Sequence, residues 1–289
     1  MSSHNSLEKV KKLREITGVG FKDCKNVIDE TNGDIEKSIE LLRKKGIAKA
    51  SMRIDRKAAE GLICIKEKNN SYSIVEINSE TDFVAKNNEF IDFAEEISEI
   101  TLDKFGILKD IMVSKMKNNK SVNDNLVALI SKIGEKINFR RSYYIESKNC
   151  FNFSYVHSSL KKNVGKLGVL LSLETAKNKN EVEDLGKKLA MQIAASSPLS
   201  VDKIDLDRKI LDKEKEIITE ELKNSGKDVK IIDKIAEGKL NKFIKENTLM
   251  NQEWILEPKK KVKDVIKEVA GKDKIVITKF IRFKVGEGI

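Results

Sequence analysis

The sequence of 289 residues has few of the residues from which metal sites and catalytic centres are commonly built. It has two histidines, His4 and His157, and three cysteines, Cys24, Cys64 and Cys150, which are far apart along the chain. Because no CxxC pair or zinc-ligand spacing occurs, we expect no structural metal. An odd number of scattered cysteines is typical of small buried hydrophobic residues in a reducing compartment.

Sequence motifs for covalent or phosphate chemistry are also missing. We find no GxxxxGK[ST] loop, no GxGxxG after a strand, no GxSxG and no HExxH. A lone histidine at a strand end, as predicted for His157, is more often a surface residue than a catalyst. Most carboxylates alternate with lysines at the spacing of solvated helix pairs. The sequence therefore gives no reason to predict an enzyme, and we expect no cofactor.

Long apolar runs are absent as well. No segment approaches the eighteen or so apolar residues that indicate a transmembrane helix, and "MSSHNSLEKVKKLRE" has no apolar signal core. We therefore expect a cytoplasmic protein without membrane contact. The only prolines are Pro198 and Pro258, so long helices are permitted over most of the chain.

Charge is abundant, at 35% of residues, with a formal net charge of +10. Such a balance suggests an anionic partner. However, lysine supplies most of the positive charge and aromatic residues make up 6% of the chain, whereas nucleic-acid readers favour arginine forks and stacking aromatics. We therefore expect no direct contact with nucleic acid, and keep a basic RNA-associated protein as an alternative.

Residues 1–56 predict a three-helix domain followed by a linker. Ser6 and Asp34 are candidate caps of the first and third helices, while Gly18 and Gly46 mark helix ends, the second followed by a helical extension or linker. The residues expected to face inward in the second helix are Phe21, Cys24, Val27 and Ile28. A unit of this size is typically a binding module, so an adaptor acting through it is a second alternative.

Residues 57–147 predict a first α+β subdomain. The runs "GLICIKEK" and "YSIVEIN" flank "NNS", which indicates a β-hairpin, and helices near Phe90 and Val122 precede the strand "INFRRSYYIES". Residues 148–289 repeat this order with "FNFSYVH", "LGVLLSLET", the helix "EVEDLGKKLAMQIAAS" and the strand "KIVITKFIRFKV". We therefore predict an α+β protein with a duplicated core of antiparallel sheets.

An insertion at about residues 201–247 of the second subdomain is almost entirely charged helix. Two amphipathic runs meet at Ser225-Gly226, which predicts an antiparallel coiled-coil hairpin. Its apolar stripe is too narrow to bury a core of its own. We therefore expect the hairpin to project and to pack against the parent domain or against a second copy in a homodimer.

Five segments in this order resemble the elongation factor Ts family and extend over almost the whole chain. They are "LREITGVGFKDCKNVIDETNGDIEKSIELLRKKG", "INSETDFVAKN", "IGEKINFRR", "QIAASSP" and "FIRFKVGEG". The first is similar to the family's ubiquitin-associated domain, and residues 201–247 lie where the family carries its dimerisation insertion. The resemblance implies a guanine-nucleotide exchange factor that binds elongation factor Tu, GDP-bound or nucleotide-free, and supports translation elongation.

The resemblance also implies site residues. In the family the Asp-Phe pair reaches into elongation factor Tu beside the magnesium and phosphate site, which here assigns Asp82 and Phe83. Arg14 and Phe21 match the face laid on the partner's nucleotide domain, and His157 matches a contact to its third domain. The complete predicted partner-binding set is Thr81, Asp82, Phe83, Val84, Ala85, Lys86, Asn87, His157, Arg14 and Phe21. Of these, we expect Thr81 and Asn87 to position the loop.

Alternatives remain for individual residues. Phe83 is otherwise a hydrophobic staple on the helix that follows, with Thr81 or Asp82 as its cap. Phe21 is otherwise part of the core of the three-helix domain. Many family members continue past "VGEG" into a C-terminal helix that embraces the partner. The sequence stops at Ile289, so we expect that contact to be missing.

Overall fold

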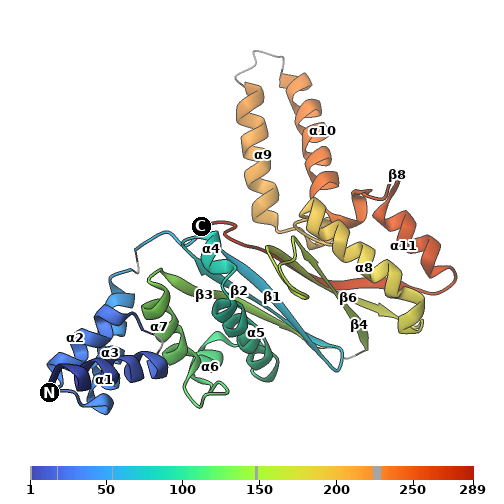
Figure 1. The fold of residues 1–289 in the computed structure, drawn as a ribbon. Helices are drawn as coiled ribbons and strands as arrows, with labels where there is room; N and C mark the ends of the chain where they lie inside the picture. The colour runs from blue at the N-terminus through green and yellow to red at the C-terminus, as the bar shows by residue number, and fades with distance from the viewer. Residues whose placement is uncertain (1, 18, 54, 147–148, 224–228) are drawn as a thin grey trace.

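A computed structural model describes residues 2–17, 19–53, 55–146, 149–223 and 229–289 (Figure 1). The N-terminal part consists of the helices α1 (Ser2–Thr17), α2 (Phe21–Glu30) and α3 (Ile35–Ser51). The Asp34 carboxylate accepts a hydrogen bond from the Lys37 backbone N at 3.0 Å, which confirms the predicted cap. The prediction for Ser6 is wrong, because α1 begins four residues earlier. Past Gly46 the chain continues as helix to Ser51, so of the two alternatives, a helical extension or a linker, the helical extension is confirmed.

The first sheet is antiparallel, with strand order β3-β2-β1-β5. Its strands are β1 (Glu60–Lys68), β2 (Ser71–Ser79), β3 (Ile137–Ile145) and the short β5 (Val164–Gly165). The predicted hairpin turns at Asn69 and Asn70, whose φ angles of 51° and 61° suit the tight turns that match strand twist. After β2 come the single turn α4 (Asp82–Ala85) and the helices α5 (Asn88–Asp103), α6 (Leu108–Val113) and α7 (Val122–Ile133).

The second sheet has strand order β4-β6-β9. Its strands are β4 (Cys150–His157), β6 (Leu167–Thr175) and β9 (Ile275–Lys284), and the helices α8 (Lys179–Ser196) and α11 (Val262–Ala270) pack on it. The inward face predicted for α8 is confirmed, since four residues are buried there: Val182, Leu185, Leu189 and Ile193. A small sheet pairs β7 (Glu253–Trp254) with β8 (Glu257–Lys261).

The two sheets share one topology. In each, two strands form an antiparallel pair, a helix packs on that pair, and a later strand joins the second strand of the pair. Each sheet also has one irregularity in strand pairing, between Glu76 and Ile77 in β2 and between Ser172 and Leu173 in β6. Counted from Ser71 and Leu167, these are the sixth and seventh residues of both strands. Duplication of one unit would produce this agreement.

The sheets pack face to face, with helices on their outer sides (Figure 1). In β1, Leu62 and Cys64 belong to the core beneath α5, whereas Ile63 and Ile65 face the second sheet. Gly168 of β6 permits the close approach, since a Cβ there would lie 2.7 Å from Ile63 Cγ2. Because both faces of β1 and β6 are buried, their sequences are continuous apolar runs and do not alternate.

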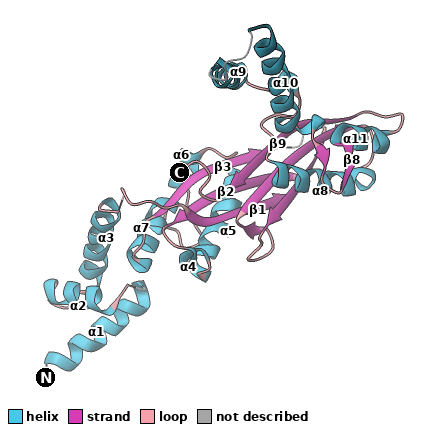
Figure 2. Cartoon of the chain, turned by 90° about the horizontal axis from the view of Figure 1, so that it is seen from above, coloured by secondary structure: helices cyan, strands magenta, loops and turns pink. Residues whose placement is uncertain are grey.

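The charged insertion projects from the second sheet as two helices, α9 (Arg208–Lys223) and α10 (Val229–Asn247) (Figures 1 and 2). Ile218 and Leu222 of α9 are buried against Ile235 and Leu240 of α10. The predicted turn at Ser225-Gly226 lies outside the described residues. Within the described part of the chain, no helix is long and apolar enough to span a membrane.

The prediction of buried cysteines is confirmed at two of three positions. Cys24 and Cys64 are buried, whereas Cys150 is half-buried at the start of β4. Burial raises the pKa of the Cys64 thiol to about 11, so this thiol is protonated and unreactive near neutral pH.

Gly186→Ala is expected to lower the free energy of unfolding, although alanine is the better helix former. An added Cβ would lie 2.5 Å from ring carbons of Phe153, and overpacking of this kind costs about 1–3 kcal/mol. The matched control is Gly238→Ala in α10, where nothing lies within 4 Å and alanine should gain about 0.5–1 kcal/mol. Urea denaturation measures both. A free energy of unfolding that rises in Gly186→Ala, as it should in the control, would show that α8 does not pack tightly on Phe153.

Candidate partner-binding site

Phe83 is displayed to solvent on the single helical turn α4, between β2 and α5. Its exposed fraction is 79%, while the next two residues, Val84 and Ala85, are buried in the core of the first sheet. The two buried side chains fix the turn, and the aromatic ring points away from the core. The interpretation of Phe83 as a staple packed on the following helix is therefore wrong.

Side-chain hydrogen bonds hold both ends of this turn. The Thr81 backbone N and Oγ1 donate to the two Glu135 carboxylate oxygens at 3.0 and 2.8 Å, and Ser79 Oγ donates to the Thr81 carbonyl at 2.8 Å. At the other end, the Asn87 side chain accepts from the Glu89 backbone N at 2.9 Å and so caps α5. The cap of α5 is thus Asn87, and the expectation of Thr81 or Asp82 in that role is wrong.

Asp82 places a negative charge beside the exposed ring. Its carboxylate is bonded to the Lys86 ammonium at 2.7 Å, one helical turn later. The hydrogen bond from Lys86 holds the pKa of the Asp82 carboxyl below its usual value, so Asp82 is ionised at neutral pH. The turn therefore presents a charged carboxylate and a phenyl ring together.

His157 is the exposed last residue of β4. Its Nδ1 is 3.1 Å from the Tyr155 hydroxyl, and its carbonyl accepts from the Lys166 backbone N at 3.2 Å. Lys166 in turn pairs with Glu60 at 2.7 Å, and its charge contributes to the lowered pKa of Asp82. The structure therefore brings the histidine strand end and the Asp82 turn to one edge.

Arg14 and Phe21 belong to a separate, N-terminal group. Both side chains are exposed, Phe21 by 44%. The expectation that Phe21 faces inward is wrong, because the buried face of α2 consists of Cys24, Val27 and Ile28. Figures 1 and 2 place α1 and α2 away from α4, with α3 and α7 between them.

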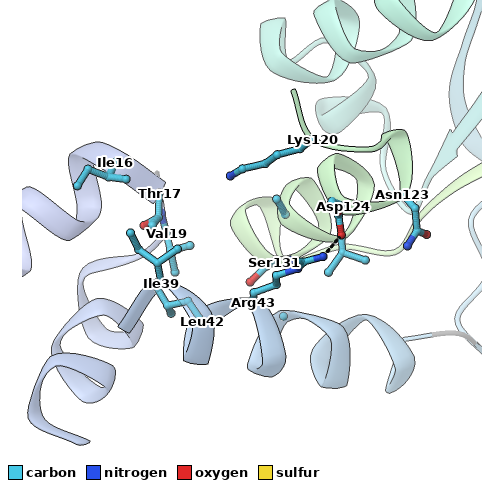
Figure 3. A pocket seen from close by; sticks show the side chains of 13 residues that line it. Ile16, Thr17, Val19, Ile39, Leu42, Arg43, Lys120, Asn123, Asp124 and Ser131 are labelled. Atoms are coloured by element: carbon cyan, nitrogen blue, oxygen red, sulfur yellow. Dashed lines mark hydrogen bonds and ion pairs between the residues drawn. The ribbon is translucent and has the colours of Figure 1, made fainter. Parts of the chain in front are cut away.

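A pocket of about 270 Å³ lies where the N-terminal helices meet α7 (Figure 3). Ile16, Val19 and Leu42 contribute its apolar wall, and Lys120 points across it from the opposite side. Arg43 of α3 pairs with Asp124 of α7 at 2.5 Å beside the pocket. This junction sets how the surface bearing Arg14 and Phe21 is held against the sheets.

Glu76, which was not among the predicted site residues, is a carboxylate in the middle of β2 with an exposed fraction of 0%. Arg140 Nη1 donates to it at 3.0 Å, Arg141 Nε at 2.5 Å, Asn78 Nδ2 at 3.1 Å and the Gly286 backbone N at 3.0 Å. The network joins the "RR" of β3 to the C-terminal "GEG". A signal was present, since Glu76 interrupts an apolar run whose strand is buried on both faces.

Comparisons with known proteins agree with these features. A family model described as "Elongation factor TS" matches residues 80–287. Elongation factor Ts from Bartonella quintana is 41% identical over 285 residues, which cover 97% of this chain and 92% of that protein. The corresponding values are 40% over 283 residues (97% and 91%) for Rickettsia prowazekii and 37% over 286 residues (97% and 91%) for Maricaulis maris. The chain belongs to the elongation factor Ts family.

Membership in the elongation factor Ts family confirms the function predicted from the resemblance. The chain is a guanine-nucleotide exchange factor for elongation factor Tu in translation elongation, and it is not an enzyme. Family membership therefore decides against the two alternative main roles that the sequence left open, an adaptor and an RNA-associated protein. Elongation factor Tu is therefore the partner whose surface the exposed residues have to fit.

Proposed function

We propose that the chain promotes GDP release by inserting the Asp82-Phe83 turn beside the magnesium and phosphate site of elongation factor Tu, so that GTP can bind. The observation that carries this proposal is the 79% exposure of Phe83 on a turn fixed at both ends. Single exposed apolar residues are common on protein surfaces. Phe83 differs because buried neighbours and hydrogen bonds hold it in one direction.

The proposed insertion needs no covalent chemistry. A nucleoside diphosphate is held by oriented backbone donors and a bridging magnesium ion. A phenyl ring placed among these elements displaces them, and each charge-assisted hydrogen bond lost is worth about 1.5–3 kcal/mol. Losing a few such bonds weakens GDP binding by several powers of ten. Because the coupling is reciprocal, a rebinding nucleotide expels the exchange factor by the same factor.

The other predicted residues are proposed as docking contacts. His157 anchors the edge of the second sheet to another part of elongation factor Tu, while Arg14 and Phe21 lie against its nucleotide domain. Residues 1–56 then form a ubiquitin-associated-like domain with its linker. Residues 57–147 and 148–289 form two copies of a duplicated α+β unit, which the shared strand order and matching irregularities support. We place this activity in the cytoplasm, where translation elongation proceeds.

Release of a fluorescent GDP analogue from elongation factor Tu tests the proposed function. Adding the wild-type chain is expected to accelerate release by several orders of magnitude, with a rate that saturates as the chain is titrated. Excess unlabelled GDP prevents rebinding of the analogue. A release rate that stays at its spontaneous value over the whole titration would contradict the proposal.

His157→Ala is expected to raise the concentration of chain that gives half-maximal acceleration about tenfold, with little change in the maximal rate. A contact remote from the nucleotide contributes equally to all bound states and so changes affinity alone. The same release assay, run over a range of chain concentrations, separates the two parameters. A lower maximal rate at unchanged half-saturation would show that His157 acts on the nucleotide site.

The helical hairpin is proposed as a surface for a second copy of the chain. Ile210 and Ile217 of α9 are 37% and 50% exposed and, at seven residues apart, share one face of the helix. Ile217→Lys is expected to shift a concentration-dependent dimer to monomer while leaving exchange activity intact. Light scattering at several concentrations checks this. A wild-type chain that stays monomeric at all of them would remove the proposal.

A further inference from the structure

We propose that Glu135 is a positioning residue for nucleotide exchange, acting through Thr81 to hold the turn that presents Phe83. Glu135 lies in the loop between α7 and β3, 54 residues along the chain from Thr81. Its side chain accepts hydrogen bonds from Thr81 and not from Asp82 or Phe83, so its effect on the ring is indirect. The inference rests on the proposed function of the Phe83 turn.

The two oxygens of Glu135 bind one residue in two ways. Oε2 accepts from the Thr81 backbone N at 3.0 Å, and Oε1 accepts from the Thr81 hydroxyl at 2.8 Å. Thr81 stands at the N-terminal cap of α4, which is four residues long. Such a short helix is not stable by itself and leaves its first backbone donors without helical partners. The order of the turn therefore depends on groups outside it, and Glu135 supplies one.

A second hydrogen bond runs in the opposite direction between the same two segments. Glu80 Oε1 accepts from the Lys136 backbone N at 2.6 Å, so each segment gives a backbone N–H to the other segment's carboxylate. We call these residues, Glu80, Thr81, Glu135 and Lys136, the reciprocal clasp. Arg56, in the linker after the N-terminal helices, also joins it through Glu80 at 3.3 Å.

The reciprocal clasp, together with the hydrogen bond from Ser79 Oγ to the Thr81 carbonyl, holds the start of the turn, whereas the buried Val84 and Ala85 hold its end. With the start released, the Phe83 ring samples several directions, and the competent one becomes a fraction of the population. The efficiency of exchange falls to that fraction of its wild-type value, because ordering must then take place during binding. Loss of a charge-assisted hydrogen bond corresponds to about tenfold or more in such an equilibrium.

The test is a double-mutant cycle on GDP release from elongation factor Tu, with Glu135→Gln, Phe83→Ala and the double variant. The efficiency of release is the release rate divided by the chain concentration, measured at low chain concentration. Glu135→Gln is expected to reduce this efficiency about tenfold. In the Phe83→Ala background the same change is expected to have no further effect, because Glu135 acts through the ring. Glu96→Gln is the matched control, since Glu96 also accepts from a backbone N–H, that of Lys117, outside the turn.

Two further measurements keep the test independent of folding. Amide hydrogen exchange at Thr81 is expected to be faster in Glu135→Gln than in wild type, with the urea midpoint measured alongside. Thr81→Val, which keeps the backbone hydrogen bond and removes only the hydroxyl, is expected to lose about threefold in efficiency. If Phe83→Ala alone retains wild-type exchange, the proposed function of the turn fails. If Phe83→Ala loses exchange while Glu135→Gln and Thr81→Val match wild type, the role of Glu135 is overturned. It is also overturned if the losses caused by Glu135→Gln and Phe83→Ala multiply independently in the double variant.

Discussion

Phe83→Ala is expected to reduce the chain's acceleration of GDP release from elongation factor Tu at least thirtyfold, because a buried aromatic anchor at an interface is worth about 2–4 kcal/mol. The same change is expected to leave the free energy of unfolding within about 0.5 kcal/mol of wild type, since the residue is 79% exposed. Fluorescent GDP release and urea denaturation measure the two quantities. Loss of activity without loss of stability is the signature of a contact that exists only in the complex.

The matched control for this variant is Phe105→Ala. Phe105 is also exposed, by 63%, and lies in the first sheet's half of the molecule, where its ring contacts Tyr144 edge-on at a centroid distance of 5.3 Å. Its removal is expected to leave GDP release unchanged. Equal losses of GDP release from both variants would point to a general effect of removing surface aromatics. Full activity of Phe83→Ala would show that the Phe83 ring has no role in exchange.

Glu76→Ala is expected to lower the free energy of unfolding by about 3–5 kcal/mol, the cost of breaking a buried ion pair by removing one partner. The change would leave the guanidinium groups of Arg140 and Arg141 without their shared carboxylate, and the Gly286 backbone N without an acceptor. Only glycine fits at this position, since its φ is 72° and an added Cβ would lie 2.2 Å from the Ala59 carbonyl oxygen. Chemical denaturation gives the difference.

A surface ion pair provides the comparison for Glu76. Glu99 pairs with Lys66 in an exposed setting, and Glu99→Gln is expected to cost less than about 1 kcal/mol. A Glu76→Ala variant as stable as Glu99→Gln would show that the buried network contributes little. The predicted result would explain why the β3 and C-terminal segments resemble the family together, since one carboxylate holds both.

Much of the fold followed from local patterns in the sequence. The β1–β2 hairpin, the buried face of α8 and the projecting helical insertion were predicted, because each has a turn signal or a long periodic run. The short elements α6, α11, β5, β7 and β8 were not, because runs this short carry little periodicity. Phe21 fitted the helical period of α2, yet it is the first residue of that helix and has no preceding turn against which to pack.

The site required contacts that no local pattern contains. Asp82-Phe83 was assigned by resemblance, since a phenylalanine beside a strand end equally predicts a staple, and only the exposure of Phe83 in the structure excluded the staple. Glu76 and Arg141 are 65 positions apart, and Thr81 and Glu135 are 54 apart. Such pairings depend on how the strands and loops meet in three dimensions.

GDP and this chain are expected to weaken each other's binding to elongation factor Tu, and Phe83 is expected to carry this coupling. The most direct test measures the dissociation constant of GDP with and without saturating chain, and the dissociation constant of the chain with and without saturating GDP. Both constants are expected to rise by the same factor, of several powers of ten, and this factor is expected to fall towards one in Phe83→Ala. Equal affinity of the wild-type chain for elongation factor Tu in the presence and absence of GDP would contradict it.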